Sequence, residues 1–196
     1  TNHNAETFFT GANFLAYGQN LKLIRAANTS VAKNATNGSA GILIKNKDHY
    51  ELNYLDLSAA NTAGMWAARY AGDLGNSLRV SLFAGSANVG ADFAYWEYNQ
   101  EFNGIPETST FVADKGGAND EMHIIVIDTL GKFSGGQANT VLEKFSFVSK
   151  ASDATNDDGS SNYYVNVIND KSEFIYVLNH AQNPTTYLNE KIGRAH

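Results

Sequence analysis

The chain has 196 residues, of which 43% are hydrophobic and 12% aromatic, so it can bury the core of one or two domains and is not a disordered segment. Its 14 basic and 20 acidic residues give a net charge of −6, which argues against nucleic acid as the main partner. The absence of cysteine excludes disulfides, thiolate metal sites and cysteine nucleophiles, and the short apolar runs predict no membrane insertion.

The first 57 residues predict a helix, a strand and then loops. Apolar residues recur at helical spacing over residues 5–17, with Asn4 as the expected cap and Gly18 as the expected stop. Residues 21–25 (LKLIR) predict a strand. Residues 27–39 are rich in Asn, Thr, Ser, Ala and Gly, which predicts a loop. A short apolar run at 41–44 and a mixed stretch to residue 57 follow, and a small inserted module is one interpretation of them.

The central part predicts a turn, a strand and an irregular excursion. Residues 69–75, with two glycines and a Gly-Asn step at the end, predict the turn. Residues 78–82 alternate between apolar and polar side chains, which predicts a half-buried strand. Residues 84–119 are irregular and rich in Gly and Ala. Their aromatic residues indicate a packed surface excursion and not a flexible linker: Phe93, Tyr95, Trp96, Tyr98 and Phe102.

The strongest core signal lies at residues 122–127, a β-branched run typical of a strand buried on both faces. Glycines at 131, 135 and 136 predict a turn, and residues 141–148 predict the partner strand. A polar loop (152–161), a short helix (163–169) and an apolar strand (174–178) follow. We therefore predict an α/β fold of mixed α+β type, a layered sheet-and-helix core with loop-rich inserted segments.

Few residues suggest a chemical site. Asp120, Glu121 and His123 together suggest metal ligands or an acid–base pair, but solvated polar residues at a strand entrance explain them equally well. Residues 153–159 resemble a calcium loop, yet Ala154 occupies the first ligand position and no Glu follows Gly159 at the bidentate position. The five histidines are scattered singly. We predict no catalytic, cofactor-binding or metal-binding residue and no cofactor.

Three stretches resemble the tail sheath proteins of contractile-tailed bacteriophages of the myovirus type. They are residues 6–26 (ETFFTGANFLAYGQNLKLIRA), 68–82 (ARYAGDLGNSLRVSL) and 119–180, which contains VLEKF, an acidic loop and SSNYY. In the second stretch Ala71 stands where the family commonly has proline. Together the stretches cover about half of the chain, in the family's order.

The resemblance implies a structural subunit and not an enzyme. Such subunits polymerise around a tail tube, and the sheath contracts to drive the tube through the host envelope for genome delivery. The implied partners are neighbouring sheath subunits in helical rings, joined by strand addition, together with the tube, baseplate and tail terminator proteins. The implied location is the virion, after assembly in the host bacterial cytoplasm. A sheath of an R-type bacteriocin or a secretion system is a related alternative, and an enzyme or ligand-binding module is an alternative of another class.

The resemblance also predicts how the chain is organised. Residues 1–27 would begin the sheath core, residues 28–64 would form a loop-rich insertion equivalent to a reduced protruding domain, and residues 65–191 would form a core domain incomplete at its C-terminus. Residues 192–196 (IGRAH) match one reading frame of a common sequencing adaptor, so we predict a translated adaptor there, with a natural C-terminus as the alternative. An internal fragment of this kind is expected to expose strand edges or apolar patches that the whole subunit covers.

Overall fold

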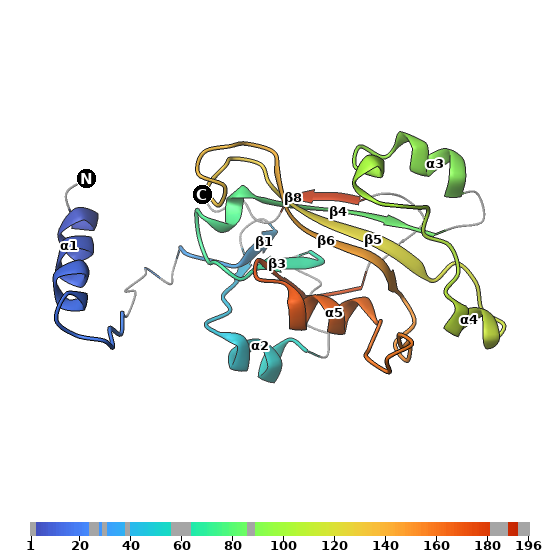
Figure 1. Cartoon of the computed structure of the whole chain (residues 1–196), viewed down its shortest axis with the longest axis horizontal. Coiled ribbons are helices and arrows are strands. Elements are labelled where there is room, and N and C mark those ends of the chain that lie inside the picture. Colours follow the sequence, from blue (N-terminus) through green and yellow to red (C-terminus); the bar gives the residue numbers. More distant parts are fainter. Residues whose placement is uncertain are drawn as a thin grey trace.

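The computed structural model describes residues 3–23, 28, 31–37, 40–55, 64–85, 89–180 and 188–191. A four-stranded antiparallel sheet lies at its centre (Figure 1). The strands run in the spatial order β6 (Thr140–Ser149), β5 (Glu121–Asp128), β4 (Leu78–Ala84) and β8 (Leu188–Lys191). Helices and antiparallel sheets together confirm the predicted mixed α/β class.

The two central strands are the ones with the strongest sequence signals. Every residue of β5 after Glu121 is buried, which confirms the strand predicted at residues 122–127. β4 pairs with it in register from Leu78↔Asp128 to Ala84↔Met122. The prediction of a half-buried β4 was wrong, because Ser81 on its polar face is also fully buried. An aromatic segment covers that face.

One face of the sheet packs against a helix and a second, smaller sheet. α5 (Tyr164–Lys171) and the antiparallel pair β3 (Trp66–Ala68) and β7 (Ile175–Val177) supply this layer. The predictions of a helix at 163–169 and a strand at 174–178 are confirmed. Apolar side chains from both layers form one core cluster, which includes Val80, Ile124, Val165, Ile168 and Ile175.

The other face is covered by the excursion between β4 and β5. It contains α3 (Val89–Tyr95), the 3-10 helix η3 (Asn99–Glu101) and α4 (Thr110–Asp114). Trp96, Tyr98 and Phe102 pack on Phe83 and Ile125 of the sheet, which confirms the predicted packed excursion. The indole N–H of Trp96 donates to the hydroxyl of the buried Ser81 at 2.9 Å. This contact explains how a polar residue is accommodated on the inner face of β4.

The connection between β5 and β6 is held by a buried carboxylate. Asp128 is fully buried and accepts hydrogen bonds from the backbone N–H groups of Lys132 (3.1 Å), Phe133 (2.7 Å) and Ser134 (2.9 Å) and from the hydroxyls of Ser77 and Ser134. Burial alone raises the pKa of this carboxyl, but the bonds from Ser77, Phe133 and Ser134 outweigh burial and hold the pKa at about 2. The glycine-rich loop is thereby tied to the sheet.

The N-terminal helix α1 (His3–Leu15) is present as predicted and stands apart from the sheet in Figure 1. It begins at His3, so Asn4 lies within the helix and is not its cap. The strand predicted at 21–25 was wrong for residues 21–23, which are irregular, and residues 24 and 25 lie outside the described residues. A strand needs a ladder partner, and residues 21–23 have none among the described residues.

The segment predicted to be a loop contains regular structure. β1 (Ala35–Asn37) and β2 (Ala40–Ile42) form a short antiparallel hairpin, where the sequence predicted a loop over 27–39. α2 (Lys47–Asn53) follows and was not predicted; its N-cap is Asn46, whose side chain accepts the His49 N–H at 2.8 Å. Single short elements of this kind lack enough periodicity to be recognised from sequence.

This segment packs against the small sheet. Tyr50 of α2 is buried, stacks on Tyr176 at 4.4 Å and donates from its hydroxyl to the Val177 carbonyl at 2.5 Å. Asn34 directly precedes β1, and its side-chain amide donates a hydrogen bond to the Ala68 carbonyl at 2.7 Å. The described part of residues 28–55 is therefore anchored on β3 and β7. The proposed limits of the inserted domain, 28–64, stay a prediction.

Candidate assembly surface

Asp120 is a structural brace. It is 5% exposed, and its carboxylate accepts hydrogen bonds from the N–H and hydroxyl of Ser109, both at 2.8 Å, and from the Ser149 hydroxyl. Ser109 is the N-cap of α4 and also accepts the Val112 N–H. The interpretation of Asp120 as a solvated residue was therefore wrong, because it joins α4 to the end of β6.

Glu121 and His123 lie on β5 but serve different neighbours. The Glu121 carboxylate accepts the Glu107 N–H at 3.1 Å. Burial raises the pKa of Glu121, and the negative charge of Asp120 adds to this effect. His123 is fully buried between aromatic rings, so it too is not the solvated residue that the sequence predicted. The three side chains do not converge on one point.

The acidic loop after β6 is a solvated turn, as predicted. Asp153 forms an ion pair with Lys115 at 2.7 Å, and Asp158 accepts the Ser160 N–H at 2.9 Å. These contacts hold the pKa of each carboxyl below its usual value. Within the described part of the chain, no cluster of three or more His, Asp or Glu side chains is arranged to hold a metal ion. The predicted absence of catalytic, cofactor-binding and metal-binding residues stays a prediction.

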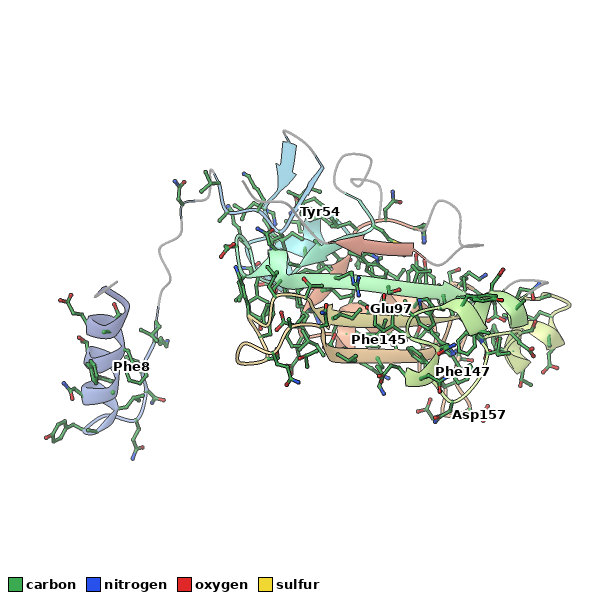
Figure 2. All side chains as sticks on the ribbon, turned by 90° about the horizontal axis from the view of Figure 1, so that it is seen from above. Phe8, Tyr54, Glu97, Phe145, Phe147 and Asp157 are labelled. Atoms are coloured by element: carbon green, nitrogen blue, oxygen red, sulfur yellow. The ribbon has the colours of Figure 1, made fainter. Side chains whose placement is uncertain are left out.

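An open cleft of about 660 Å³ lies between α4 and this acidic loop. Figure 2 shows two of its lining residues, Phe147 and Asp157, at the same end of the molecule. Its carboxylates come from Asp114, Glu121, Asp157 and Asp158, and two phenylalanine rings with hydroxyl and amide groups line the rest. Sequence reasoning did not identify this cleft, because its walls are more than 30 residues apart along the chain.

Helix α1 carries a large exposed apolar surface. Phe8 is 70% exposed, Phe9 63% and Leu15 53%, and Phe8 projects from the isolated helix in Figure 2. Phe8 and Leu15 lie two turns apart on one helical face, and Phe9 lies beside that face, about 100° around the helix from Phe8. The opposite side forms a groove with the segment that follows the helix, where Phe14 lies near Leu21 and Leu23. An apolar face of this size normally marks a contact with another protein surface.

The central sheet ends in strands that can receive a further strand. β6 and β8 are its edges, and β6 is ten residues long. The end of β6 is covered, because Ser149 forms a bridge with Tyr163 and its N–H donates to the Asn162 carbonyl. Along residues 140–146 no described strand pairs with its outer side. This edge matches the expectation that the chain exposes strand edges.

These features define a mixed α/β structural domain with an exposed apolar helix and an open sheet edge. The described part of the chain contains no helix with the length and apolar character needed to cross a membrane.

The sequence is similar to the tail sheath protein of Salmonella phage ViI, with 28% identity over 131 residues. The match covers 66% of this chain and 17% of that protein, so the chain spans a small part of its relative's length. No family model matches the sequence, and comparison with solved structures returned no significant match. The similarity supports a sheath-like relationship.

Proposed function

We propose that the protein is a structural subunit of a contractile phage tail sheath, which polymerises around the tail tube and contracts to drive the tube through the host envelope for genome delivery. The observation that carries the proposal is the 28% identity over 131 residues to a phage tail sheath protein. The order of the three resembling stretches, at 6–26, 68–82 and 119–180, supports it.

The interior of the domain suits a part that moves as a rigid body. Buried polar groups are tied across elements: Asp128 holds the β5–β6 loop, and Asp120 joins α4 to β6. Glu143 on β6 accepts the Ser172 hydroxyl and the Glu173 N–H, both at 2.7 Å, so β6 is also tied to the segment before β7. A contracting assembly changes its subunit contacts while each domain keeps its internal packing.

Two surfaces supply contacts in this proposal. The apolar face of α1 is covered when the subunit is complete and assembled, and the outer edge of β6 accepts a strand from a neighbouring subunit. Strand addition uses backbone hydrogen bonds and therefore tolerates variation in side chains.

The remaining assignments follow from the same proposal. Residues 1–27 begin the sheath core, 28–64 are a reduced protruding insertion, and 65–191 are the incomplete core domain. The partners are neighbouring subunits in helical rings, the tail tube, and the baseplate and tail terminator proteins. The protein has no catalytic or cofactor-binding residues, and its place is the virion, after assembly in the host cytoplasm.

Two other functions remain for comparison. A sheath subunit of an R-type bacteriocin or a secretion system would share the same core. The genes that neighbour its own would distinguish it from a phage sheath subunit. A ligand-binding module is favoured by one observation, the open acidic cleft that contains Glu121 with its raised pKa. Such a module would bind its ligand as a monomer and would form no tubes.

The test is negative-stain electron microscopy of the protein from the complete open reading frame, expressed alone and together with the tail tube protein of the same phage. We expect long striated tubes. A protein that stays monomeric in both preparations overturns the proposal.

Variants of α1 test the surface separately. Phe8→Glu combined with Phe9→Glu places charges on the apolar face and is expected to abolish tubes, while circular dichroism stays unchanged because both side chains are exposed. The control is Asn13→Glu, an exposed polar position of the same helix, which is expected to keep tubes. Tubes in the double variant would remove α1 from the proposed contacts.

A further inference from the structure

The pairing of β5 with β6 contains a bulge next to a buried histidine. Met122 pairs with Val148, but Ile124 pairs with Phe145, so two residues of β6 lie opposite His123 alone. A bulge of this kind leaves a backbone N–H of the bulged strand outside the ladder, and this N–H needs another acceptor. The bulged strand therefore depends on a side chain for one of its hydrogen bonds.

The imidazole of His123 supplies that acceptor. The N–H of Phe147, a residue with φ +53°, donates to Nδ1 of His123 at 3.1 Å. The other ring nitrogen, Nε2, lies 2.9 Å from the carbonyl oxygen of Gly104. A carbonyl oxygen only accepts and a backbone N–H only donates, so Nε2 carries the proton and Nδ1 carries none. The geometry requires the neutral ring in one tautomer.

This ring also joins the sheet to the excursion that covers it. Gly104 and Phe102 belong to the excursion, and the Phe102 ring stacks on His123 at 4.3 Å with an interplanar angle of 7°. The ring of Phe147, which lies on β6, contacts the imidazole edge-to-face with the ring centroids 4.6 Å apart. The ring of Phe93, which lies on α3, makes the same kind of contact at 6.0 Å. His123 thus contacts three separate segments and is fully buried among them.

No carboxylate among the described residues stabilises a charged ring. The hydrogen bonds of His123 go to two backbone groups, and burial lowers the pKa of the imidazole. The charged side chains on the surrounding elements face solvent or other partners. On the excursion and β4 they are Asp92 of α3, Glu101 of η3 (paired with Lys144 of β6), Glu107, and Arg79 of β4 (paired with Glu97). On β5 and β6 they are Glu121 (bonded to the Glu107 N–H), Asp128 (bonded to the loop after β5) and Glu143 (bonded to Ser172 and Glu173).

We propose that His123 is a pH-operated latch: the neutral imidazole holds residues 96–107 on the sheet, and protonation in mild acid releases them and loosens the bulge at Phe147. A proton on Nδ1 would place two donors against each other at the distance of the present hydrogen bond and would leave a buried charge without a counter-ion. Release exposes the aromatic layer of Trp96 and Phe102. The inference stands on the fold of the described residues and does not depend on the sheath assignment.

The direction of the pH dependence follows from the ring's environment. The pKa of His123 is lower in the closed state than in an open or unfolded chain, where it is about 6.5. The latch therefore keeps its full strength above about pH 6.5 and weakens as the pH falls, because the open state then binds the proton more tightly. The opening equilibrium constant rises up to about tenfold per pH unit between the two pKa values.

The first test is NMR of the 196-residue chain. Long-range ¹H–¹⁵N spectra are expected to show His123 as the neutral Nε2–H tautomer at pH 7.5. The protection factor of the Phe147 amide is expected to fall as the pH is lowered from 7 to 5, by at most about tenfold for each pH unit. A protonated ring or an Nδ1–H tautomer at pH 7.5 overturns the proposal, as does protection that is constant over this range.

The second test uses His123→Asn, which keeps an acceptor oxygen near the position of Nδ1 and cannot titrate. If it folds, its Phe147 protection is expected to stay constant from pH 7 to 5. The matched control is His180→Asn, which alters a histidine bonded to Tyr164 at 2.9 Å and is expected to keep the wild-type pH profile. If the His180→Asn variant loses the pH dependence, then His180 and not His123 causes it, and the proposal is overturned. The measurement on the unaltered chain decides the proposal even if His123→Asn does not fold.

Discussion

The sharpest stability prediction concerns Asp128→Asn. The carboxylate of Asp128 accepts the N–H groups of Phe133 at 2.7 Å and Ser134 at 2.9 Å, and it is fully buried. Asparagine keeps the shape of the side chain but replaces one acceptor oxygen with an NH₂ donor. One or more of the loop N–H groups would then meet a donor or remain unpaired in the interior.

The stability lost when the Asp128 carboxylate becomes an amide follows from the pKa shift and from the cost of an unpaired donor. The hydrogen bonds lower the pKa of Asp128 from 3.8 to about 2, which at about 1.36 kcal/mol per pH unit corresponds to ~2.4 kcal/mol of stabilisation by the charged form. Leaving a buried donor unsatisfied costs about 1–3 kcal/mol by itself. We therefore expect Asp128→Asn to lower the free energy of unfolding by about 2–4 kcal/mol at pH 7.

The assay is urea denaturation of the 196-residue chain, followed by the fluorescence of Trp66 and Trp96, which are both buried. The pKa of Asp128 is lower in the folded state, so its stabilisation is complete above about pH 4–5 and is lost as the pH falls towards 2. The difference between the wild-type chain and Asp128→Asn is therefore expected to shrink below pH 4. The control, Asp157→Asn in the exposed acidic loop, should change stability by less than about 0.5 kcal/mol.

Two results would refute this reasoning. The first is an Asp128→Asn variant within about 0.5 kcal/mol of the wild-type chain at pH 7. The second is a large loss of stability that stays the same from pH 7 to pH 2.5, which would assign the effect to packing and not to the charge.

Two further substitutions test the anchoring of the loops, each measured by the same urea denaturation. Tyr50→Phe removes the hydroxyl that donates to the Val177 carbonyl and should lower the free energy of unfolding by about 1–3 kcal/mol. The control Tyr54→Phe, at the partly buried end of α2, should lower it less, and equal effects would contradict the anchoring role of Tyr50. Gly131 and Gly135 have similar positive φ angles, +74° and +72°, but a Cβ added at Gly131 would lie 2.5 Å from loop backbone, whereas one added at Gly135 would meet no atom within 4 Å. Gly131→Ala should therefore lower the free energy of unfolding by at least ~1 kcal/mol more than Gly135→Ala. A smaller difference would show that the loop can shift.

Sequence patterns predicted the parts of the fold that local chemistry specifies. The β-branched run at 122–127, the glycines after it and the apolar run at 141–148 predicted β5, its turn and β6. The helix α5 and the aromatic excursion were also recognised. In each case a continuous apolar pattern between turn residues carries enough information, because burial of that pattern is favourable in almost any arrangement of the sheet.

Sequence patterns failed where an element depends on a distant partner. β3 is the three-residue segment Trp66–Ala68, and it is a strand only because β7 lies beside it. The predicted strand at 21–25 has the right composition but no ladder partner for its described residues. α2 has few apolar residues, and its position depends mainly on one tyrosine, Tyr50.

The polar residues show the same division between local and distant information. The sequence by itself determined that the chain has no cysteine ligand or nucleophile, and that Asp120, Glu121 and His123 stand at the start of the β-branched run. Only the tertiary structure decided that Asp120 braces α4 and that His123 is buried at a bulge. The physical reason is that a buried polar side chain is stable only beside its hydrogen-bond partners. Here those partners, Ser109 and Phe147, are set by chain crossings that no local pattern specifies.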